Sequence, residues 1–103
     1  MSVINVTKEN FEAEVLKSDV PVLADFNAGW CGPCRAMKPM LDELAEGNTA
    51  YKIVSIDIDE EDELADEYDV SSIPCLVVFK GGEEVNRSVG LIAKDAIAEL
   101  VED

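Results

Sequence analysis

The spacing of apolar and polar residues predicts four elements in the first half of the chain. A short strand is expected over residues 3–6, followed by a helix over residues 7–18 with Thr7 as its N-cap. Residues 20–28 are almost continuously apolar, which is typical of a strand buried on both faces of a parallel sheet. A second helix is expected from residue 34 to about residue 46, because apolar side chains recur there every three or four positions.

The second half of the chain continues this alternation and ends with a hairpin. A strand is predicted over residues 51–57 and a short acidic helix over residues 60–68. Two further strands, 75–80 and 83–89, flank a Gly-Gly pair, which is a strong signal for a two-residue hairpin turn. A helix over residues 94–102 closes the chain.

The resulting order, βαβαβαββα, predicts an α/β fold with a single mixed sheet and helices on both faces. Strands that alternate with helices are expected to pair in parallel through right-handed crossovers, and the terminal hairpin adds an antiparallel edge. The chain has no internal repeat, low-complexity tract or linker, so we expect one domain over residues 1–103.

Composition limits the class of protein further. At 48% apolar residues the chain can bury a core without crosslinks or metal, and three cysteines are too few for a disulfide scaffold. The longest apolar run, residues 75–79, is too short to cross a bilayer. Residues 1–8 lack the features of a signal peptide, so we expect a cytoplasmic protein, although a cleaved export signal would leave the same sequence.

The net charge of −15 argues against binding to nucleic acid or to an anionic membrane, because both require a basic surface. The acidic residues concentrate between positions 57 and 69, where they alternate with apolar residues. The favoured interpretation is a solvated helix face that keeps the protein soluble. A docking surface for a basic partner and adaptation to high salt are the alternatives.

The segment Trp30-Cys31-Gly32-Pro33-Cys34 lies where the second predicted strand leads into a helix. Two cysteines three positions apart share one face of a helical turn and can approach disulfide distance. Gly32 and Pro33 suit a first turn, whose amides have no partner within the helix. Cys31 then lies at the positive end of the helix, which favours its thiolate, so it is expected to attack a substrate disulfide. Cys34, one turn further in and more shielded, is expected to resolve the mixed disulfide.

A lone Cys-x-x-Cys pair also occurs in zinc sites and by coincidence. Zinc is disfavoured because the chain has no histidine and only one other cysteine. Two incidental cysteines in a helix remain an alternative on spacing alone.

Asp25 interrupts the apolar strand six residues before Cys31. An acid inside a buried strand is costly to ionise, so its pKa should rise. Such a group, poised near neutral pH, could take the proton of Cys34 and return it. The alternative, a position at the solvated end of the strand, is equally compatible with the sequence.

With these residues in view, the chain resembles the thioredoxin family over nearly its whole length. The pentapeptide Trp-Cys-Gly-Pro-Cys is highly specific in this strand-to-helix position. The resemblance rests on Asp25-Phe26, Ala28, residues 30–35, Pro39, Ile73-Pro74, Phe79-Lys80-Gly81-Gly82 and Val89-Gly90.

The resemblance implies features that the residues alone do not. Without it, Pro74 would simply begin a strand; the family implies a cis peptide bond that faces the cysteine pair and excludes metal from it. The backbone of Ile73 would pair with a bound polypeptide in the manner of a strand. The implied docking surface around Cys31 is flat and largely uncharged, and consists of Trp30, Gly32, Pro33, Ile73, Pro74, Val89, Gly90 and Leu91.

The family also implies the partners. Its substrates are disulfides in other proteins, and its electron donor is a reductase of the thioredoxin reductase type rather than a cofactor bound by the domain. We therefore expect no cofactor and no metal, and a monomer.

Three positions depart from the family pattern. Asn27 replaces an aromatic residue, which should weaken packing without touching the chemistry. Ser55 stands where many members carry a lysine beside the buried aspartate, so the pKa of Asp25 should rise further. Lys52 cannot substitute, because a separation of three places it on the opposite face of the strand. Cys75 follows Pro74 where threonine is usual, and should lie close to Cys31 and Cys34.

Cys75 has two interpretations. It is a small core residue without chemistry, or it is a third thiol that traps a mixed disulfide or helps to hold an iron–sulfur cluster.

The favoured function is a thiol–disulfide oxidoreductase that reduces protein disulfides through Cys31 and Cys34. The alternative from another class is a redox-sensing binding module, whose partner docks or leaves according to the oxidation state of the pair. An oxidant rather than a reductant is a third possibility, but the Gly-Pro between the cysteines resembles the reducing members.

Overall fold

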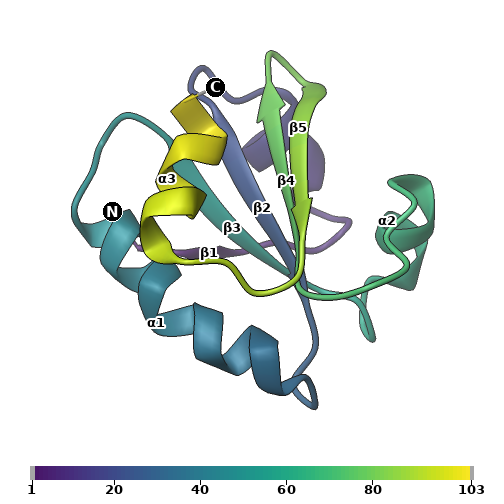
Figure 1. The fold of residues 1–103 in the computed structure, drawn as a ribbon. Coiled ribbons are helices and arrows are strands. Elements are labelled where there is room, and N and C mark those ends of the chain that lie inside the picture. Colours follow the sequence, from purple (N-terminus) through teal and green to yellow (C-terminus); the bar gives the residue numbers. More distant parts are fainter. Residues whose placement is uncertain (1, 103) are drawn as a thin grey trace.

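The computed structural model describes residues 2–102, which form a five-stranded mixed sheet (Figure 1). The strand order across the sheet is β1-β3-β2-β4-β5. The strands are β1 (Ile4–Asn5), β2 (Val22–Asn27), β3 (Lys52–Asp57), β4 (Cys75–Lys80) and β5 (Glu83–Val89). The predicted single mixed sheet is therefore confirmed, and both hairpin strands begin and end at the predicted residues.

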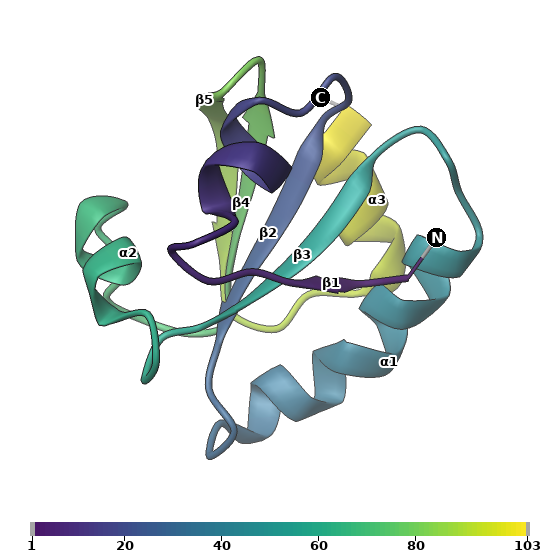
Figure 2. The same ribbon diagram turned by 180° about the vertical axis from the view of Figure 1, so that it is seen from behind.

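Helical elements cover both faces of the sheet (Figure 2). One face carries η1 and α2, and the other carries α1 and α3. Each side has its own hydrophobic cluster, because successive residues of the central strand β2 point to opposite faces: Val22 and Ala24 to one, Leu23 to the other. The elements are η1 (Glu12–Leu16), α1 (Gly32–Glu46), α2 (Asp62–Glu67) and α3 (Lys94–Glu102).

The direction of β4 differs from the prediction. β1, β2 and β3 pair in parallel, but β4 is antiparallel to β2 as well as to β5. Phe26, near the end of β2, pairs with Ile56 on one side and with Cys75, the first residue of β4, on the other. β4 therefore begins at the same end of the sheet at which β3 ends. A parallel crossover would have to carry the chain back along the whole sheet. The helix α2 has only six residues and does not do so.

The predicted helix over residues 7–18 is also wrong in length and type. Its regular part is a five-residue π-helix, in which the Lys17 N–H donates to the Glu12 carbonyl. Thr7 does cap the preceding turn, since its hydroxyl accepts from the Glu9 N–H. The element ends against the hairpin turn, where a Cβ on Gly82 would lie 2.9 Å from the Leu16 carbonyl oxygen. Tertiary packing against the hairpin thus overrides the local helical pattern.

The helices of the described residues 2–102 include none that is both long and apolar enough to span a bilayer.

Candidate active site

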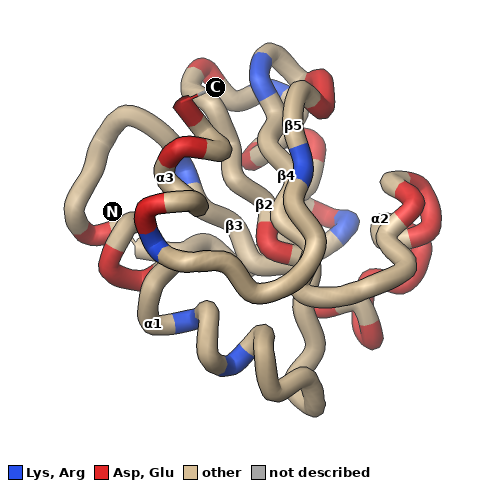
Figure 3. The backbone as a smooth tube through the Cα atoms, viewed as in Figure 1, with Lys and Arg blue, Asp and Glu red and all other residues tan. Residues whose placement is uncertain are grey.

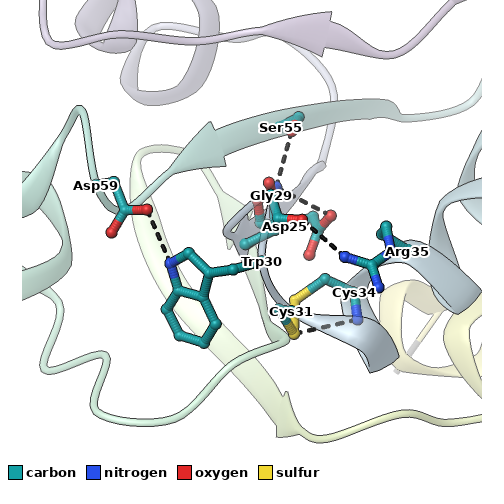
Figure 4. The surroundings of a disulfide bond; sticks show 9 residues. Asp25, Gly29, Trp30, Cys31, Cys34, Arg35, Ser55 and Asp59 are labelled. Atoms are coloured by element: carbon teal, nitrogen blue, oxygen red, sulfur yellow. Dashed lines mark hydrogen bonds between the residues drawn. A yellow bond between two sulfur atoms is a disulfide. The ribbon is translucent and has the colours of Figure 1, made fainter.

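A disulfide joins Cys31 and Cys34 at the start of α1 (Figure 4). Cys31 is the N-cap in an extended conformation, and its Sγ accepts a hydrogen bond from the Cys34 N–H at 3.2 Å. The helix begins at Gly32, two residues before the predicted start, with Pro33 in the first turn. The Cys31 sulfur therefore lies directly at the amide-rich end of a 15-residue helix, where negative charge is stabilised.

The expected difference in shielding between the two cysteines is absent in this oxidised form, because both are 5% exposed. Their surroundings differ instead. Cys34 lines a groove between α1 and the ends of the neighbouring strands, and Asp25 lines the same groove. Both cysteines belong to one buried cluster with Ala28, against which Ile58 and Ile73 pack.

Asp25 lies within β2 and is 6% exposed, which makes it the only buried charged side chain in residues 2–102. The predicted position inside the strand is confirmed, and the alternative at a solvated end is wrong. Burial raises the pKa of Asp25 from 3.8 to about 7, although a hydrogen bond from Asn27 opposes this shift. The carboxyl group can therefore bind or release a proton at neutral pH.

Asn27 contacts Asp25, which sequence analysis did not anticipate. Its Nδ2 donates to Asp25 Oδ2 at 3.2 Å and to Ser55 Oγ at 2.8 Å. The sequence contained a usable signal, because residues 25 and 27 point to the same face of a strand. What it lacked was the register, which pairs Asp25 with Ser55 across β2 and β3.

Lys52 lies on the opposite face, as predicted. Its Nζ is 3.0 Å from Glu14 Oε1 and 3.1 Å from the Glu14 carbonyl oxygen. Among residues 2–102 no ion pair reaches Asp25. Burial of this carboxyl group is therefore uncompensated by a cation in contact with it.

Two residues of the implied docking surface, Gly32 and Pro33, directly follow Cys31 at the start of α1. The Ile73–Pro74 peptide bond is cis, which confirms the expectation from the family, and Ile73 packs against the cluster of Ala28, Cys31 and Cys34. The Gly90 N–H donates to the Pro74 carbonyl at 2.8 Å, and Gly90 has φ +98°, a conformation that favours glycine. Gly32 and Pro33 are exposed and Pro74 is buried. Trp30, Val89 and Leu91 are large apolar side chains that are 67%, 56% and 49% exposed.

Trp30 has a partner that sequence analysis did not identify. Its indole Nε1–H donates to Asp59 Oδ2 at 2.9 Å (Figure 4). Asp59 belongs to the turn that leads to α2, around which acidic residues gather (Figure 3). The exposed tryptophan is thus held next to the most acidic part of the chain.

Cys75 does not share the surroundings of the disulfide. It is 1% exposed and belongs to the hydrophobic cluster under η1 and α2, together with Phe26 and Val77. The disulfide belongs to a separate cluster with Ala28 and Ile73. The expectation of close proximity is wrong because alternation along β4 turns this side chain toward the opposite face from Leu76 and α1. Within residues 2–102 no three Cys, Asp or Glu side chains gather in a way that could hold a metal ion.

Comparison with known proteins gives a consistent assignment. A family model described as Thioredoxin matches residues 2–103. The thioredoxin of Bacillus subtilis is 49% identical over 102 residues, which cover 98% of this chain and 96% of that protein. Thioredoxin 1 of Nostoc sp. is 45% identical over 94% of this chain and 92% of its own length. A solved structure of a mutant thioredoxin from Halobacterium salinarum is similar with a TM-score of 0.90 at 39% identity, covering 98% of this chain and 88% of that one.

A family match over nearly the whole chain, a fold shared with a solved thioredoxin and a Cys31–Cys34 disulfide at the start of α1 agree with one another. The chain belongs to the thioredoxin family and is a thiol–disulfide oxidoreductase that reduces protein disulfides.

Proposed function

We propose that Cys31 is the nucleophile of this reaction. In the reduced protein its thiolate attacks one sulfur of a substrate disulfide, forms a mixed disulfide and displaces the other substrate sulfur as a thiolate. The observation that carries this assignment is the position of Cys31 as the N-cap of α1, where free backbone N–H groups favour the thiolate.

We propose that Cys34 resolves the mixed disulfide with Asp25 as its proton acceptor. The Cys34 thiol loses its proton, and the resulting thiolate attacks Cys31 Sγ and displaces the second substrate thiolate. The protein ends as the disulfide, and two electrons have passed to the substrate. Asp25 suits this role because it lines the same groove as Cys34 and its pKa is raised to about 7 by burial.

We propose that substrates dock on the exposed apolar surface around the disulfide. Trp30, Val89 and Leu91 supply its large side chains, and the Gly32–Pro33 segment lies next to the sulfur that is attacked. An extended polypeptide can add as a strand to the backbone of Ile73. Among the described residues 2–102, the backbone N–H and carbonyl of Ile73 form no hydrogen bond with another backbone group. Pro74 holds this segment next to Gly90.

The remaining assignments follow from the family. We propose a single domain over residues 1–103 that acts as a cytoplasmic monomer. Its electrons come from a thioredoxin reductase-type donor, and its substrates are disulfide-containing proteins; neither nucleic acid nor membrane is expected to bind. Cys75 is assigned to the core, because its cluster does not include the disulfide and burial raises its thiol pKa.

A trapping experiment tests the roles of the two cysteines. The Cys34→Ser variant should accumulate with substrate proteins bound through Cys31, because the step that releases them is missing. Cys31→Ser should trap nothing, and Cys75→Thr should turn over insulin disulfides with dithiothreitol at the rate of the parent. Trapping through Cys34 in the Cys31→Ser variant would reverse the assignment. Binding that depends on oxidation state without any turnover would favour the redox-sensing module.

A further inference from the structure

The side-chain amide of Asn27 forms a bridge between the buried acid and the next strand. Its Nδ2 donates to Asp25 Oδ2 at 3.2 Å, to the Asp25 carbonyl at 2.9 Å and to Ser55 Oγ at 2.8 Å. The other carboxyl oxygen, Asp25 Oδ1, is buried and has no hydrogen-bond partner among residues 2–102. Asn27 is therefore the only described side chain that donates a hydrogen bond to this carboxyl group.

The charged and titratable groups around Asp25 do not duplicate this contact. The strand β3 presents Ser55 directly opposite Asp25. None of the cations forms an ion pair with Asp25 within the described part of the chain, and Lys52 is bound to Glu14 on the far face. The charged and titratable groups that line the same groove as Asp25 are Cys34, Arg35, Lys38, Asp42 and Glu46 from α1 and Asp57 from β3. Cys75 of β4 belongs to the cluster on the other face of the sheet, although burial and, to a smaller extent, the charge of Asp25 raise the pKa of its thiol.

We propose that Asn27 is a positioning residue: its amide, anchored on Ser55, orients the Asp25 carboxyl group and stabilises its ionised form. A hydrogen bond to an ionised group is stronger than one between neutral groups, and it favours the charged state. Ser55 keeps the donor in place, because its hydroxyl oxygen accepts the shortest of the three contacts.

The pair of Asn27 and Ser55 thereby replaces a nearby cation with a neutral donor. A neutral donor offsets only part of the desolvation of the carboxylate, so the pKa of Asp25 stays near neutrality. The consequence for catalysis, namely that Asn27 sets the pH at which Cys34 can lose its proton, rests on the proposed role of Asp25.

The test is the carboxyl titration of Asp25, followed by carbon-13 NMR in the oxidised protein. Asn27→Leu keeps the size of the side chain and removes the donor, so the midpoint should move upward by about one pH unit. Ser55→Ala removes only the anchor and should move the midpoint less in the same direction. The double variant should match Asn27→Leu alone, because both changes act through one contact.

Asn48→Leu is the matched control. It removes another asparagine whose amide donates to a backbone carbonyl, that of Leu44, and that forms no hydrogen bond with Asp25 or Ser55 within residues 2–102. It should alter stability without moving the Asp25 midpoint. A merely structural role for Asn27 predicts the same behaviour for the two asparagine variants.

An Asp25 midpoint that stays in place in Asn27→Leu, or moves down, overturns the proposal. If Asn27→Leu does not fold, Ser55→Ala alone decides, and an unchanged midpoint in that variant also overturns it. A midpoint that rises while the pH profile of Cys34 alkylation stays fixed supports the contact between Asn27 and Asp25. The same outcome would refute the proposed role of Asp25 in proton transfer.

Discussion

The two faces of the central strands treat buried charge in opposite ways. On the face covered by η1, Lys52 is half-buried and meets Glu14 at 3.0 Å, so both charges are compensated. On the face covered by α1, Asp25 is more deeply buried and meets only a neutral amide. The first arrangement pairs two opposite charges, whereas the second leaves an acid that can exchange its proton near pH 7. The difference indicates that the face under η1 is organised for stability and the face under α1 for chemistry.

The largest expected effect distinguishes the two faces by activity. Cys31→Ser should reduce the rate of insulin reduction by about 10³-fold or more, because no other thiol can take the place of the nucleophile. Lys52→Met, on the opposite face, should stay within about twofold of the parent, since its charge acts only on folding. Comparable losses of activity in the two variants would show that the faces are not separated in function.

The next largest effect is the pH dependence of stability. Between pH 4 and pH 7 the unfolded carboxyl group of Asp25 is ionised, while the folded one retains its proton. Folding therefore binds a proton, and this group makes the protein less stable as the pH rises through that range. Asp25→Asn removes this cost, so its free energy of unfolding should exceed that of the parent by on the order of 3 kcal/mol at pH 8.

At pH 4 the gain should shrink to well under about 1 kcal/mol, because this pH is close to the unfolded pKa of 3.8 and much of the unfolded state is then protonated as well. Urea unfolding at the two pH values measures the difference. An equal gain at both values would show that the effect comes from packing and not from ionisation.

A smaller effect is expected when a cation is introduced next to Asp25, as Lys52 lies next to Glu14 on the other face. Ser55→Lys places a cation opposite Asp25, in register across β2 and β3. The pKa of Asp25 should fall from about 7 by roughly 1–2 pH units, because an opposite charge favours the carboxylate. Ser55→Met is the control, since it adds similar length without charge. Carboxyl titrations that agree between these two variants would contradict the interpretation.

The smallest effect concerns the ion pair of Lys52 and Glu14 on the face covered by η1. Lys52→Met should destabilise the protein by roughly 0.5–1 kcal/mol, since a partly exposed ion pair contributes little. The loss should be the same at pH 6 and pH 8. Glu14→Gln serves as the matched variant, and denaturant unfolding is the measurement. A loss that grows between these pH values would mean that Lys52 senses Asp25 through the sheet.

Much of the fold could be predicted because its signals are local. The Gly81-Gly82 turn defines the hairpin of β4 and β5, and the apolar run before Cys31 marks the central strand. The direction of β4 could not be predicted, because it depends on where α2 returns the chain to the sheet. The π-helix could not be predicted either, since the packing of Leu16 against Gly82 is a contact between distant segments.

The candidate site divides in the same way. The cysteine pair and Asp25 were predicted because each breaks a local pattern in a way that chemistry explains. The contact between Asn27 and Asp25 required the side-chain geometry of strand β2, and the partner of Trp30 required a turn brought from 29 residues away. The surroundings of Cys75 could not be predicted, because Ile73, two residues earlier, packs against the cluster of the disulfide while Cys75 belongs to the cluster on the other face.

The carboxyl titration of Asp25 in the oxidised parent protein tests the central claim most directly. Carbon-13 NMR of this group should give a midpoint of about 7, because burial without a cation disfavours the carboxylate. A midpoint near the ordinary aspartate value of about 4 would show that the charge is compensated on this face as well. In that case the Asp25 carboxylate would be too weak a base at neutral pH to hold the proton of Cys34.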